Sequence, residues 1–511
     1  PLDNAMITDR DDALLEMGRG QRIDVDGAYL NIDYDTGFGT LTSVSGWRKQ
    51  KSRLPNSYAG TTAIAPDGDQ LSVFDARRDD DRTTYQQELR FATDTGTAVD
   101  GVIGGFFQKD KTDFCVSQIL GFLDLTNGPL PFGAWNDTPY LLCNAQKARS
   151  KALFAEGTFK ATEKLTLTGG FRYTWENKTW WGREQVFVPQ LEGGFDPTIW
   201  IDQPLDASVF KYTNGVIKVK DSAKKPTWRV SIGYQANPDL FSYFTYSRGF
   251  KAGGFNDQIG GFAPFGGNQP LFAEAAKATK PETADSFELG LKSEFLDRRL
   301  RFNLTGFYVK YKDMQRELNV PIEVNGVRNQ VTRFVNAASA KVKGIEVETV
   351  ARPVEQLTLR GVLGYQHGKY STYEVAPGLG GEPGSGYDLG TAPLLRTPKW
   401  TWSVDGTYNQ PLTDNFKVVL NANVSYVSAN LFSQSITSAA GNAYLNARTL
   451  LNASITLAQT DNDYYVRVVG RNLTDERYRT ANQNVGGLWL NSQYGLPRYF
   501  GVELGFQFGS N

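Results

Sequence analysis

The sequence predicts an all-β protein whose antiparallel strands cross a membrane as a barrel. Three features indicate this fold: connections alternate between tight turns and long loops, apolar and polar residues alternate with a period of two, and aromatic residues recur near strand ends. Nothing in a soluble sandwich requires short connections at one end and long connections at the other. An outer-membrane barrel, in contrast, has short periplasmic turns and long extracellular loops. The short connections are Tyr34–Gly37, Asp94–Thr97, Thr162–Glu163, Asn237–Pro238, Leu296–Arg298, Arg352–Val354, Pro411–Asp414 and Thr460–Asp463.

The two-residue period is clearest in residues 164–176, where Phe171, Tyr173 and Trp175 share one face and Arg172 and Thr174 the other. This period marks a sheet with one apolar face. The sequence offers no amphipathic helix to cover that face, so we expect lipid to cover it. We predict about 17 strands, at 21–33, 37–50, 82–94, 97–109, 148–161, 163–181, 226–237, 239–250, 282–296, 298–313, 331–351, 355–371, 396–410, 414–429, 442–459, 463–472 and 494–509.

The odd number of strands has a consequence for closure. The first strand ends in a short turn and the last follows a long loop, so both are expected to run towards the periplasm. Two such strands cannot pair antiparallel, and an open edge would leave backbone groups facing lipid. We therefore expect an odd number of strands to be missing, most simply from the N-terminus.

Composition excludes several classes of function. Basic and acidic residues balance at 54 and 55, so neither nucleic acid nor an anionic surface is indicated as the main partner. No apolar run is long enough for a helical membrane span. With one histidine, His367, and two cysteines, the chain has no material for a His- or Cys-rich metal site. No catalytic constellation stands out, so we expect neither an enzyme nor a bound cofactor.

The two cysteines, Cys115 and Cys143, lie in one predicted long loop. A disulfide between them would fit an oxidising periplasm or cell surface. Closing a loop of about 29 residues would contribute roughly 3 kcal/mol to stability in the loop-entropy account. Two unpaired thiols are the alternative.

Several segments resemble the TonB-dependent outer-membrane receptor family, most densely in the C-terminal half. Tyr246–Asn256 reads YSRGFKAGGFN, and Pro281–Gln315 reads PETADSFELGLKSEFLDRRLRFNLTGFYVKYKDMQ. NAASAKVKGIEVE, RTPKWTWSVDGTY and VGRNLTDERY follow in the order typical of the family, before the final PRYFGVELGFQF. Each match alone is weak, but their ordered succession is specific.

The resemblance implies a barrel of 22 strands around an N-terminal plug. Residues 1–511 would then be the C-terminal part of the barrel domain, with the plug, its TonB box and about five first strands absent. It also implies a Gram-negative outer-membrane receptor for energy-coupled uptake of a scarce nutrient, most often a ferric siderophore or similar metal chelate. Cobalamin, saccharides and other organic nutrients are the alternatives within the family.

The resemblance implies partners as well. These are the TonB–ExbB–ExbD complex, reached through the missing N-terminal region, and the outer-membrane lipid and lipopolysaccharide. We expect a monomer or a member of an outer-membrane complex.

Candidate ligand-binding residues come from aromatic clusters and from cations on or near polar faces. Flat rings bury much area at modest entropic cost, and Arg or Lys side chains suit an anionic chelate. The proposed set is Trp180, Trp181, Arg248, Lys251, Phe255 and Asn256, with further loop aromatics at Trp200, Phe250, Phe262, Phe265 and Phe272. Packing within the loops and pairing with barrel or plug carboxylates remain open as alternative roles.

Two other classes of protein are rivals. A passive porin would share the barrel, but porins are smaller and have shorter loops than those predicted here. A secreted β-propeller would show blades repeating every 40–50 residues or so, and the hairpins of this sequence show no such repeat.

Overall fold

The computed structural model describes residues 22–57, 63–64, 70–71, 75–93, 96–119, 140–182, 186–187, 217–256, 275–324, 327–373, 393–433, 443–461, 464–485 and 489–507. These residues form 24 strands and contain no α-helical element. In this part of the chain no helix has the length and apolar character needed to span a bilayer.

The strands, in chain order, are β1 (Arg22–Asp35), β2 (Gly39–Ser57), β3 (Ala63–Ile64), β4 (Gln70–Leu71), β5 (Asp75–Thr93), β6 (Val99–Ile119), β7 (Tyr140–Lys160), β8 (Leu165–Gly182), β9 (Val186–Phe187), β10 (Ile217–Asn237), β11 (Leu240–Lys251), β12 (Glu282–Phe295), β13 (Leu300–Val324), β14 (Val327–Val354), β15 (Leu357–Tyr373), β16 (Trp400–Pro411), β17 (Phe416–Val427), β18 (Asn430–Ser433), β19 (Ala443–Leu445), β20 (Arg448–Gln459), β21 (Tyr464–Arg471), β22 (Arg479–Val485), β23 (Trp489–Tyr494) and β24 (Tyr499–Phe506).

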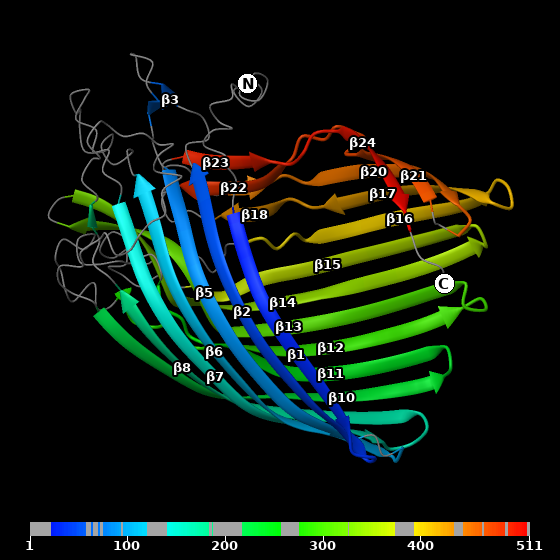
Figure 1. The fold of residues 1–511 in the computed structure, drawn as a ribbon, viewed down its shortest axis with the longest axis horizontal. Coiled ribbons are helices and arrows are strands. Elements are labelled where there is room, and N and C mark those ends of the chain that lie inside the picture. The colour runs from blue at the N-terminus through cyan, green and yellow to red at the C-terminus, as the bar shows by residue number, and fades with distance from the viewer. Residues whose placement is uncertain are drawn as a thin grey trace.

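One sheet of 18 strands dominates the fold, and three two-stranded sheets, β3–β4, β18–β19 and β22–β23, accompany it. Apart from the two-residue β9, the large sheet consists of seventeen long strands, which agrees with the number predicted. Each pairs antiparallel with the next long strand in the chain. Figure 1 shows the sheet curling round, so that β1 and β2 pass in front of strands between β10 and β14.

The short connections gather at one end of this curled sheet, the right-hand and lower side of Figure 1. In the β1–β2 turn, Gly37 has φ of 86°, a left-handed conformation that costs glycine little. Thr36 N donates to Gly39 O at 2.9 Å and closes that turn. The asymmetry predicted from the sequence, with the short turns gathered at one end of the sheet, is therefore present in the fold.

Closure of the sheet is not seen among the described residues, because no pairing joins β1 to β24. Seventeen strands paired antiparallel in succession place the first and the last in the same direction. These two strands cannot form an antiparallel ladder with each other. The expectation that a plug and about five first strands lie outside this chain stays a prediction from the resemblance.

The two faces of the sheet differ as the alternation predicted. One rung runs across β8, β10, β11, β12 and β14 through Leu167, Ile232, Phe244, Leu289 and Ile345. These side chains are between 37% and 64% exposed, so no described part of the protein covers them. A neighbouring rung on the other face is polar, and there the hydroxyls of Ser231 and Thr245 lie 2.8 Å apart. Lipid against the first face and a polar interior against the second account for this division.

Among the described residues, most of the buried apolar side chains lie at the end with the long connections. Met314, Ala338, Ala340, Tyr370, Tyr373 and Leu394 form one buried cluster on β13, β14, β15 and the segment before β16. The rings of Tyr370 and Tyr373 lie 4.6 Å apart. Both lie beyond the roughly 9–11 residues that a strand needs to cross the hydrocarbon. Burial raises the pKa of both phenols.

The cysteines lie on strands rather than in a loop, because β6 and β7 extend about ten residues further than predicted at this end. Cys115 and Cys143 are direct cross-strand partners. Cys115 is disulfide-bonded, whereas the Cys143 side chain lies outside the described residues. The pairing of the two sulfurs stays a prediction, supported by the Cα separation of about 4.5–5.5 Å in antiparallel ladders, which suits a disulfide.

We expect alkylation of the denatured, unreduced protein to modify neither Cys115 nor Cys143, and alkylation after reduction to modify both. In the loop-entropy account, reduction should lower the free energy of unfolding by about 3 kcal/mol. Mass spectrometry of the alkylated chain checks the first expectation, and denaturant unfolding in detergent checks the second. Modification of both thiols before reduction would contradict the pairing.

Candidate functional site

A cavity of about 560 Å³ opens on the inner face at the long-connection end of the sheet. Its walls come from strands far apart in the sequence, namely β5, β6, β7, β8, β11, β13 and β14, and from the segment that follows β11. Four aromatic rings line it: Phe114, Trp180, Phe255 and Phe334. We call this space the mouth cavity.

The segment Ala252–Asn256, directly after β11, folds across the inner wall to form one side of the mouth cavity. Lys178 Nζ donates to the carbonyl of Gly253 at 2.6 Å, and Gln315 Nε2 donates to the carbonyl of Ala252 at 3.0 Å. Gly254 and Thr279 exchange backbone and hydroxyl hydrogen bonds of 2.9 and 3.0 Å. Contacts with β8, β13 and Thr279 therefore hold the segment in place.

Gly253 sits where a side chain has no room. A Cβ there would lie 2.0 Å from the Thr279 carbonyl oxygen and 3.3 Å from a carboxylate oxygen of Asp221. The nearest atom is backbone, so the neighbour cannot swing away as a flexible side chain could. The close approach of this segment to the wall requires glycine.

We expect Gly253→Ala to displace Ala252–Asn256 and to weaken ligand binding about tenfold, since misplacing a contact surface by about 1 Å costs this much or more. Gly249→Ala is the matched control, because nothing lies within 4 Å of a Cβ built there. Ligand affinity and outer-membrane abundance of both variants are the measurements. Equal affinities for the two variants would show that the segment does not shape the site.

Trp180 and Phe255 form the aromatic centre of the mouth cavity. Their ring centroids lie 5.8 Å apart with planes 16° from parallel. Trp180 is 2% exposed, and its indole Nε1 has no hydrogen-bond partner among the described residues. A buried N–H without an acceptor costs stability.

The charge of the mouth cavity is net positive. Arg78 pairs with Asp80 at 3.0 Å, and Lys178 pairs with Glu176 at 3.0 Å. Lys251 makes no ion pair with the described residues, and its Nζ lies 5.4 Å from the centre of the Phe334 ring. One cation beside four rings favours a ligand that is flat, partly apolar and anionic.

The predicted ligand-binding residues divide between two faces of the sheet. Trp180, Lys251 and Phe255 line the mouth cavity, and Asn256 is buried at the end of the same segment without lining it. Trp181 lies on the outer face, because neighbours along a strand point to opposite sides, and the Lys147 Nζ lies 5.5 Å from its ring. Both tryptophans belong to β8 rather than to a loop.

Arg248 also lies on the outer face, although the sequence predicted a position on or near a polar face. It is the cross-strand partner of Trp228 and of Asp285. Its Nη2 lies 2.6 Å from Asp285 Oδ2, and its Nε donates to Oδ1 at 2.7 Å. The Tyr246 hydroxyl donates to the same carboxylate at 2.9 Å. Arg248 therefore has a structural partner and does not reach the mouth cavity.

Some lining residues were not predicted. Lys178 lies two positions before Trp180, so the period of two could have placed it on the same face. Arg78, Phe114 and Phe334 come from distant strands, and no local signal in the sequence connects them to this site. The aromatic residues Trp200, Phe262, Phe265 and Phe272 lie outside the described residues.

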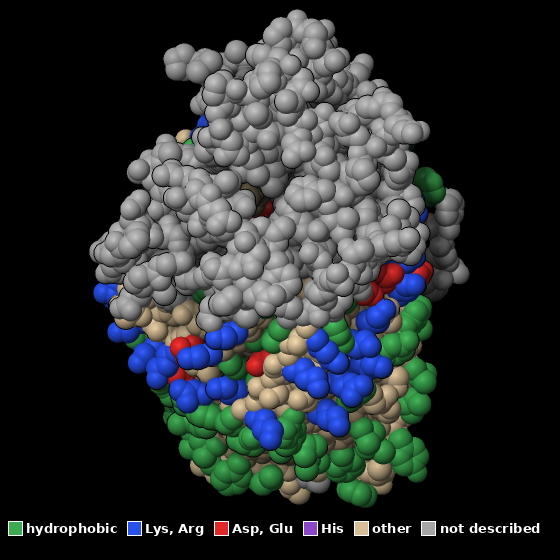
Figure 2. All heavy atoms as spheres, turned by 90° about the vertical axis from the view of Figure 1, so that its left-hand side faces the viewer, with side chains coloured by type: hydrophobic (Ala, Val, Ile, Leu, Met, Phe, Trp, Pro, Cys, Tyr) green, Lys and Arg blue, Asp and Glu red, His purple; other side chains and the backbone are tan. Residues whose placement is uncertain are grey.

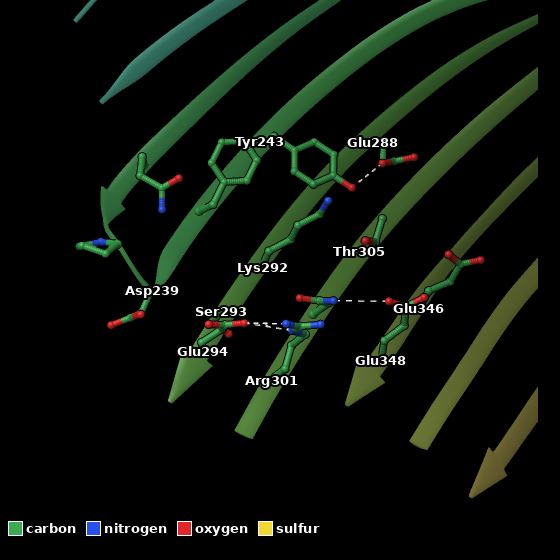
Figure 3. Close-up of a pocket in the computed structure, with 14 residues that line it drawn as sticks. Asp239, Tyr243, Glu288, Lys292, Ser293, Glu294, Arg301, Thr305, Glu346 and Glu348 are labelled. Carbon is green, nitrogen blue, oxygen red and sulfur yellow. Dashed lines mark hydrogen bonds and ion pairs between the residues drawn. The ribbon is translucent and has the colours of Figure 1, made fainter. Parts of the chain in front are cut away.

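A second inner-face cavity, of about 620 Å³, lies near the short turns and is acidic (Figure 3). Its lining includes Asp239, Glu288, Glu294, Glu346 and Glu348, with Lys292 and Arg301 as the cations. Glu288 accepts a hydrogen bond of 2.6 Å from the Tyr243 hydroxyl, and Arg301 pairs with Glu294 at 2.8 Å. The described residues contain no group of three or more His, Cys, Asp or Glu side chains that could hold a metal ion.

Comparisons with known proteins agree on the fold. The family described as "TonB dependent receptor-like, beta-barrel" matches residues 4–506. The metal-pseudopaline receptor CntO of Pseudomonas aeruginosa is 25% identical over 207 residues, which are 40% of this chain and 24% of that protein.

Solved structures are similar over most of this chain. The ferric yersiniabactin uptake receptor FyuA of Yersinia pestis has a TM-score of 0.69 at 16% identity, covering 94% of this chain and 61% of the receptor. The siderophore receptor PiuA of Acinetobacter baumannii has a TM-score of 0.64 at 16% identity, covering 95% and 64%. The copper transporter OprC has a TM-score of 0.62 at 12% identity, covering 96% and 67%.

The chain spans about a quarter of the curated relative and about three fifths of the first of these structures. At these identities the structural matches show the fold alone. The family match, in contrast, extends over nearly the whole sequence. The chain belongs to the TonB-dependent receptor-like β-barrel family, whose members lie in the Gram-negative outer membrane.

Proposed function

We propose that this chain forms the barrel of an outer-membrane receptor for TonB-dependent uptake of an anionic metal chelate, with a ferric siderophore as the leading candidate. The observation that carries the proposal is the mouth cavity, where four aromatic rings lie together with Lys251, which makes no ion pair with the described residues. Flat rings and one cation match a ligand that combines aromatic or heteroaromatic groups with negative charge.

The relatives support the same ligand class. FyuA is a ferric yersiniabactin uptake receptor, PiuA is a siderophore receptor and CntO is a metal-pseudopaline receptor. In this proposal the TonB–ExbB–ExbD complex supplies the energy, and the barrel contributes containment and recognition rather than chemistry.

We also infer that further strands and a lumenal domain complete the functional barrel. The parallel directions of β1 and β24 support this inference, because closure then needs an odd number of intervening strands. Residues 1–511 expressed alone should lack the heat-modifiable migration of a closed barrel, and the full-length receptor should show it. Heat-modifiable migration of residues 1–511 alone would contradict the inference.

Uptake under iron limitation tests the transport proposal. A strain without the receptor should fail to grow on a subset of ferric siderophores, and the full-length receptor should restore growth only when TonB is present. Restoration without TonB would indicate a passive channel instead. Growth that depends on a saccharide or on cobalamin rather than on iron would move the ligand to another class.

Lys251→Glu sharpens this test, because it reverses the unpaired charge of the mouth cavity. Uptake of an anionic chelate should fall, whereas uptake of a neutral ligand should not. Lys292→Glu in the acidic cavity near the short turns is the matched control, since Lys292 lines that cavity and not the mouth cavity.

A further inference from the structure

A third inner-face cavity, of about 210 Å³, lies next to the mouth cavity on the side of the short turns. We call it the arginine–glutamine pocket. Residues that are two positions apart on β2, β5 and β6 line it, and such residues project from the same face of a strand. Its polar lining consists of two guanidinium groups, three side-chain amides and a hydroxyl, from Arg48, Arg82, Gln50, Gln86, Gln108 and Thr84.

The arginine–glutamine pocket and the mouth cavity share the strands β5 and β6. Asp80 and Arg82 follow each other on the inner face of β5, and Asp80 lines the mouth cavity whereas Arg82 lines the pocket. Arg82 is also the direct cross-strand partner of Thr112, which lines the mouth cavity. Asp80 and Thr84 are four residues apart, about 14 Å along the strand. A ligand that leaves the mouth cavity along this wall therefore reaches the pocket next.

The arginine–glutamine pocket offers unused hydrogen-bond donors beside a positive charge. Arg48 makes no ion pair with the described residues, and its Nη2 donates to the side-chain oxygen of Gln50. The Gln86 amide has no hydrogen-bond partner among the described residues. A guanidinium has five N–H donors and no acceptor, so Arg48 has donors left for a ligand. This combination favours an anionic group that is rich in oxygen.

Asp110 fixes three of the side chains that line the pocket. Its carboxylate accepts hydrogen bonds of 2.6 Å from the Thr84 hydroxyl and 2.6 Å from Gln108 Nε2. It also accepts a hydrogen bond of 3.0 Å from Arg82 Nη2. Asp110 therefore neutralises Arg82 and holds these donors in place before a ligand arrives. Such preorganisation lowers the entropic cost of binding.

The wall formed by β10 to β14 is less favourable for an anion than the wall that carries the pocket. Its acidic cavity contains five carboxylates and two cations (Figure 3). Figure 2 faces the end with the long connections and shows Lys and Arg side chains gathered there beside the hydrophobic surface. An anion thus meets positive charge on arrival at this end. Inside the lumen, the charges favour the wall of β2, β5 and β6 over the acidic wall.

We propose that the arginine–glutamine pocket is a second ligand site, which binds an oxygen-bearing anionic arm of the chelate after the chelate has left the mouth cavity. This inference rests on the proposed function, which supplies the anionic chelate. Sites for a whole drug-sized ligand measure about 300–1,000 Å³. A cavity of about 210 Å³ therefore holds one carboxylate, hydroxamate or catecholate arm rather than the entire chelate. Binding there stabilises the ligand inside the lumen and so speeds its departure from the mouth cavity.

Arg48→Met in the full-length receptor tests the second site, because it should change the rate of uptake and not the affinity of the mouth cavity. The probe is the ferric complex of a tris(catecholate), an anionic aromatic chelate. We expect the maximal TonB-dependent uptake rate to fall about tenfold, as for the loss of a hydrogen bond to a charged group, and the affinity at the cell surface to stay within about twofold. Arg360→Met is the matched control, since Arg360 is an exposed arginine that lines none of the three cavities. It should change neither quantity.

Three results for Arg48→Met would overturn the proposal. An unchanged uptake rate would show that the pocket has no role in transport. A loss of surface affinity as large as the loss of rate would make Arg48 part of the mouth site. Lower stability of the variant without ligand, measured by denaturant unfolding of the heat-modifiable fraction, would assign Arg48 to a contact with the lumenal domain.

A reactive chelate identifies the wall that the ligand passes. Gln86→Cys places a thiol in the arginine–glutamine pocket, and Asn303→Cys places one in the acidic cavity. A ferric tris(catecholate) with a bromoacetamide arm should alkylate the first variant during uptake, only when TonB is present, and should leave the second largely unmodified. Preferential alkylation of Asn303→Cys during TonB-dependent uptake would refute the second site and leave the proposed function standing. Absence of TonB-dependent uptake by the parent would refute the proposed function, and the second site with it.

Discussion

Replacing Arg248 by methionine should lower the free energy of unfolding by about 2–3 kcal/mol, because it takes two hydrogen bonds from the buried Asp285 carboxylate. Asp285 is 8% exposed and takes two hydrogen bonds from the guanidinium, at 2.6 and 2.7 Å. Without Arg248, the Tyr246 hydroxyl is the one remaining hydrogen-bond donor to this carboxylate among the described residues. Denaturant unfolding of the full-length receptor in detergent measures the loss.

A double variant distinguishes the cost of leaving the Asp285 carboxylate unpaired from the cost of losing the Arg248 side chain. Arg248→Met combined with Asp285→Leu removes both charges and should recover most of the lost stability, because two apolar groups replace a buried pair at little net cost. Arg301→Met is the surface control. Its pair with Glu294 leaves the Arg301 side chain 59% exposed, so it should cost less than about 1 kcal/mol.

The single variant Arg248→Met also tests the ligand-binding role that the sequence suggested for Arg248. On the outer face, Arg248 should affect stability and leave the affinity of the folded receptor for its ligand unchanged. Normal stability with lost ligand affinity would instead place Arg248 in the recognition site.

Removing the aromatic centre of the mouth cavity should weaken ligand binding by about 2 kcal/mol, or roughly thirtyfold, as for a buried aromatic hot spot. The variant is Phe255→Ala, which takes away the ring stacked on Trp180. Ligand affinity is measured by tryptophan fluorescence quenching or by uptake at limiting ligand. The quantity compared is the ratio of the ligand affinity of the folded variant to that of the folded parent.

Trp180 and Trp181 provide a matched pair for this experiment, since they are adjacent on β8 and face opposite ways. Trp180→Phe keeps an aromatic ring but removes the indole N–H, and should lower affinity if a ligand oxygen accepts from Nε1. Trp181→Phe changes the outer face and should leave affinity unchanged. Equal losses from both substitutions would refute the assignment of ligand binding to the mouth cavity.

The local features of the fold were readable from the sequence because each depends on near neighbours. Tight turns such as the one at Gly37 are recognisable as short polar runs in the sequence. The alternation of apolar and polar residues in β8 follows from the pleat alone. The number of long strands follows from these two signals together. The family motifs added the receptor fold, which the match over residues 4–506 shows.

Strand length was underestimated at the long-connection end. Once a strand leaves the hydrocarbon, its outer face need not be apolar, so the alternation fades and the sequence reads as loop. The ladder nevertheless continues through Cys115 and Cys143, because backbone hydrogen bonds between β6 and β7 do not depend on side-chain polarity.

The candidate site depends on information that no local pattern contains. Its lining comes from seven strands brought together by curvature, so the meeting of Phe114, Trp180 and Phe334 follows from register across the sheet. Register also decided which face each cation occupies, and it placed Arg248 opposite Asp285 on the outside.

From its sequence alone, the chain is determined to be a membrane-spanning antiparallel barrel with tight turns at one end, because turn residues and alternation are local, and its motifs resemble the family that the match over residues 4–506 shows. Only the tertiary structure decided that Lys251 and Phe255 meet Trp180 in one cavity while Trp181 faces outwards. The physical reason is that a one-residue step along a strand reverses the face, and that sheet curvature, not sequence distance, sets which residues become neighbours.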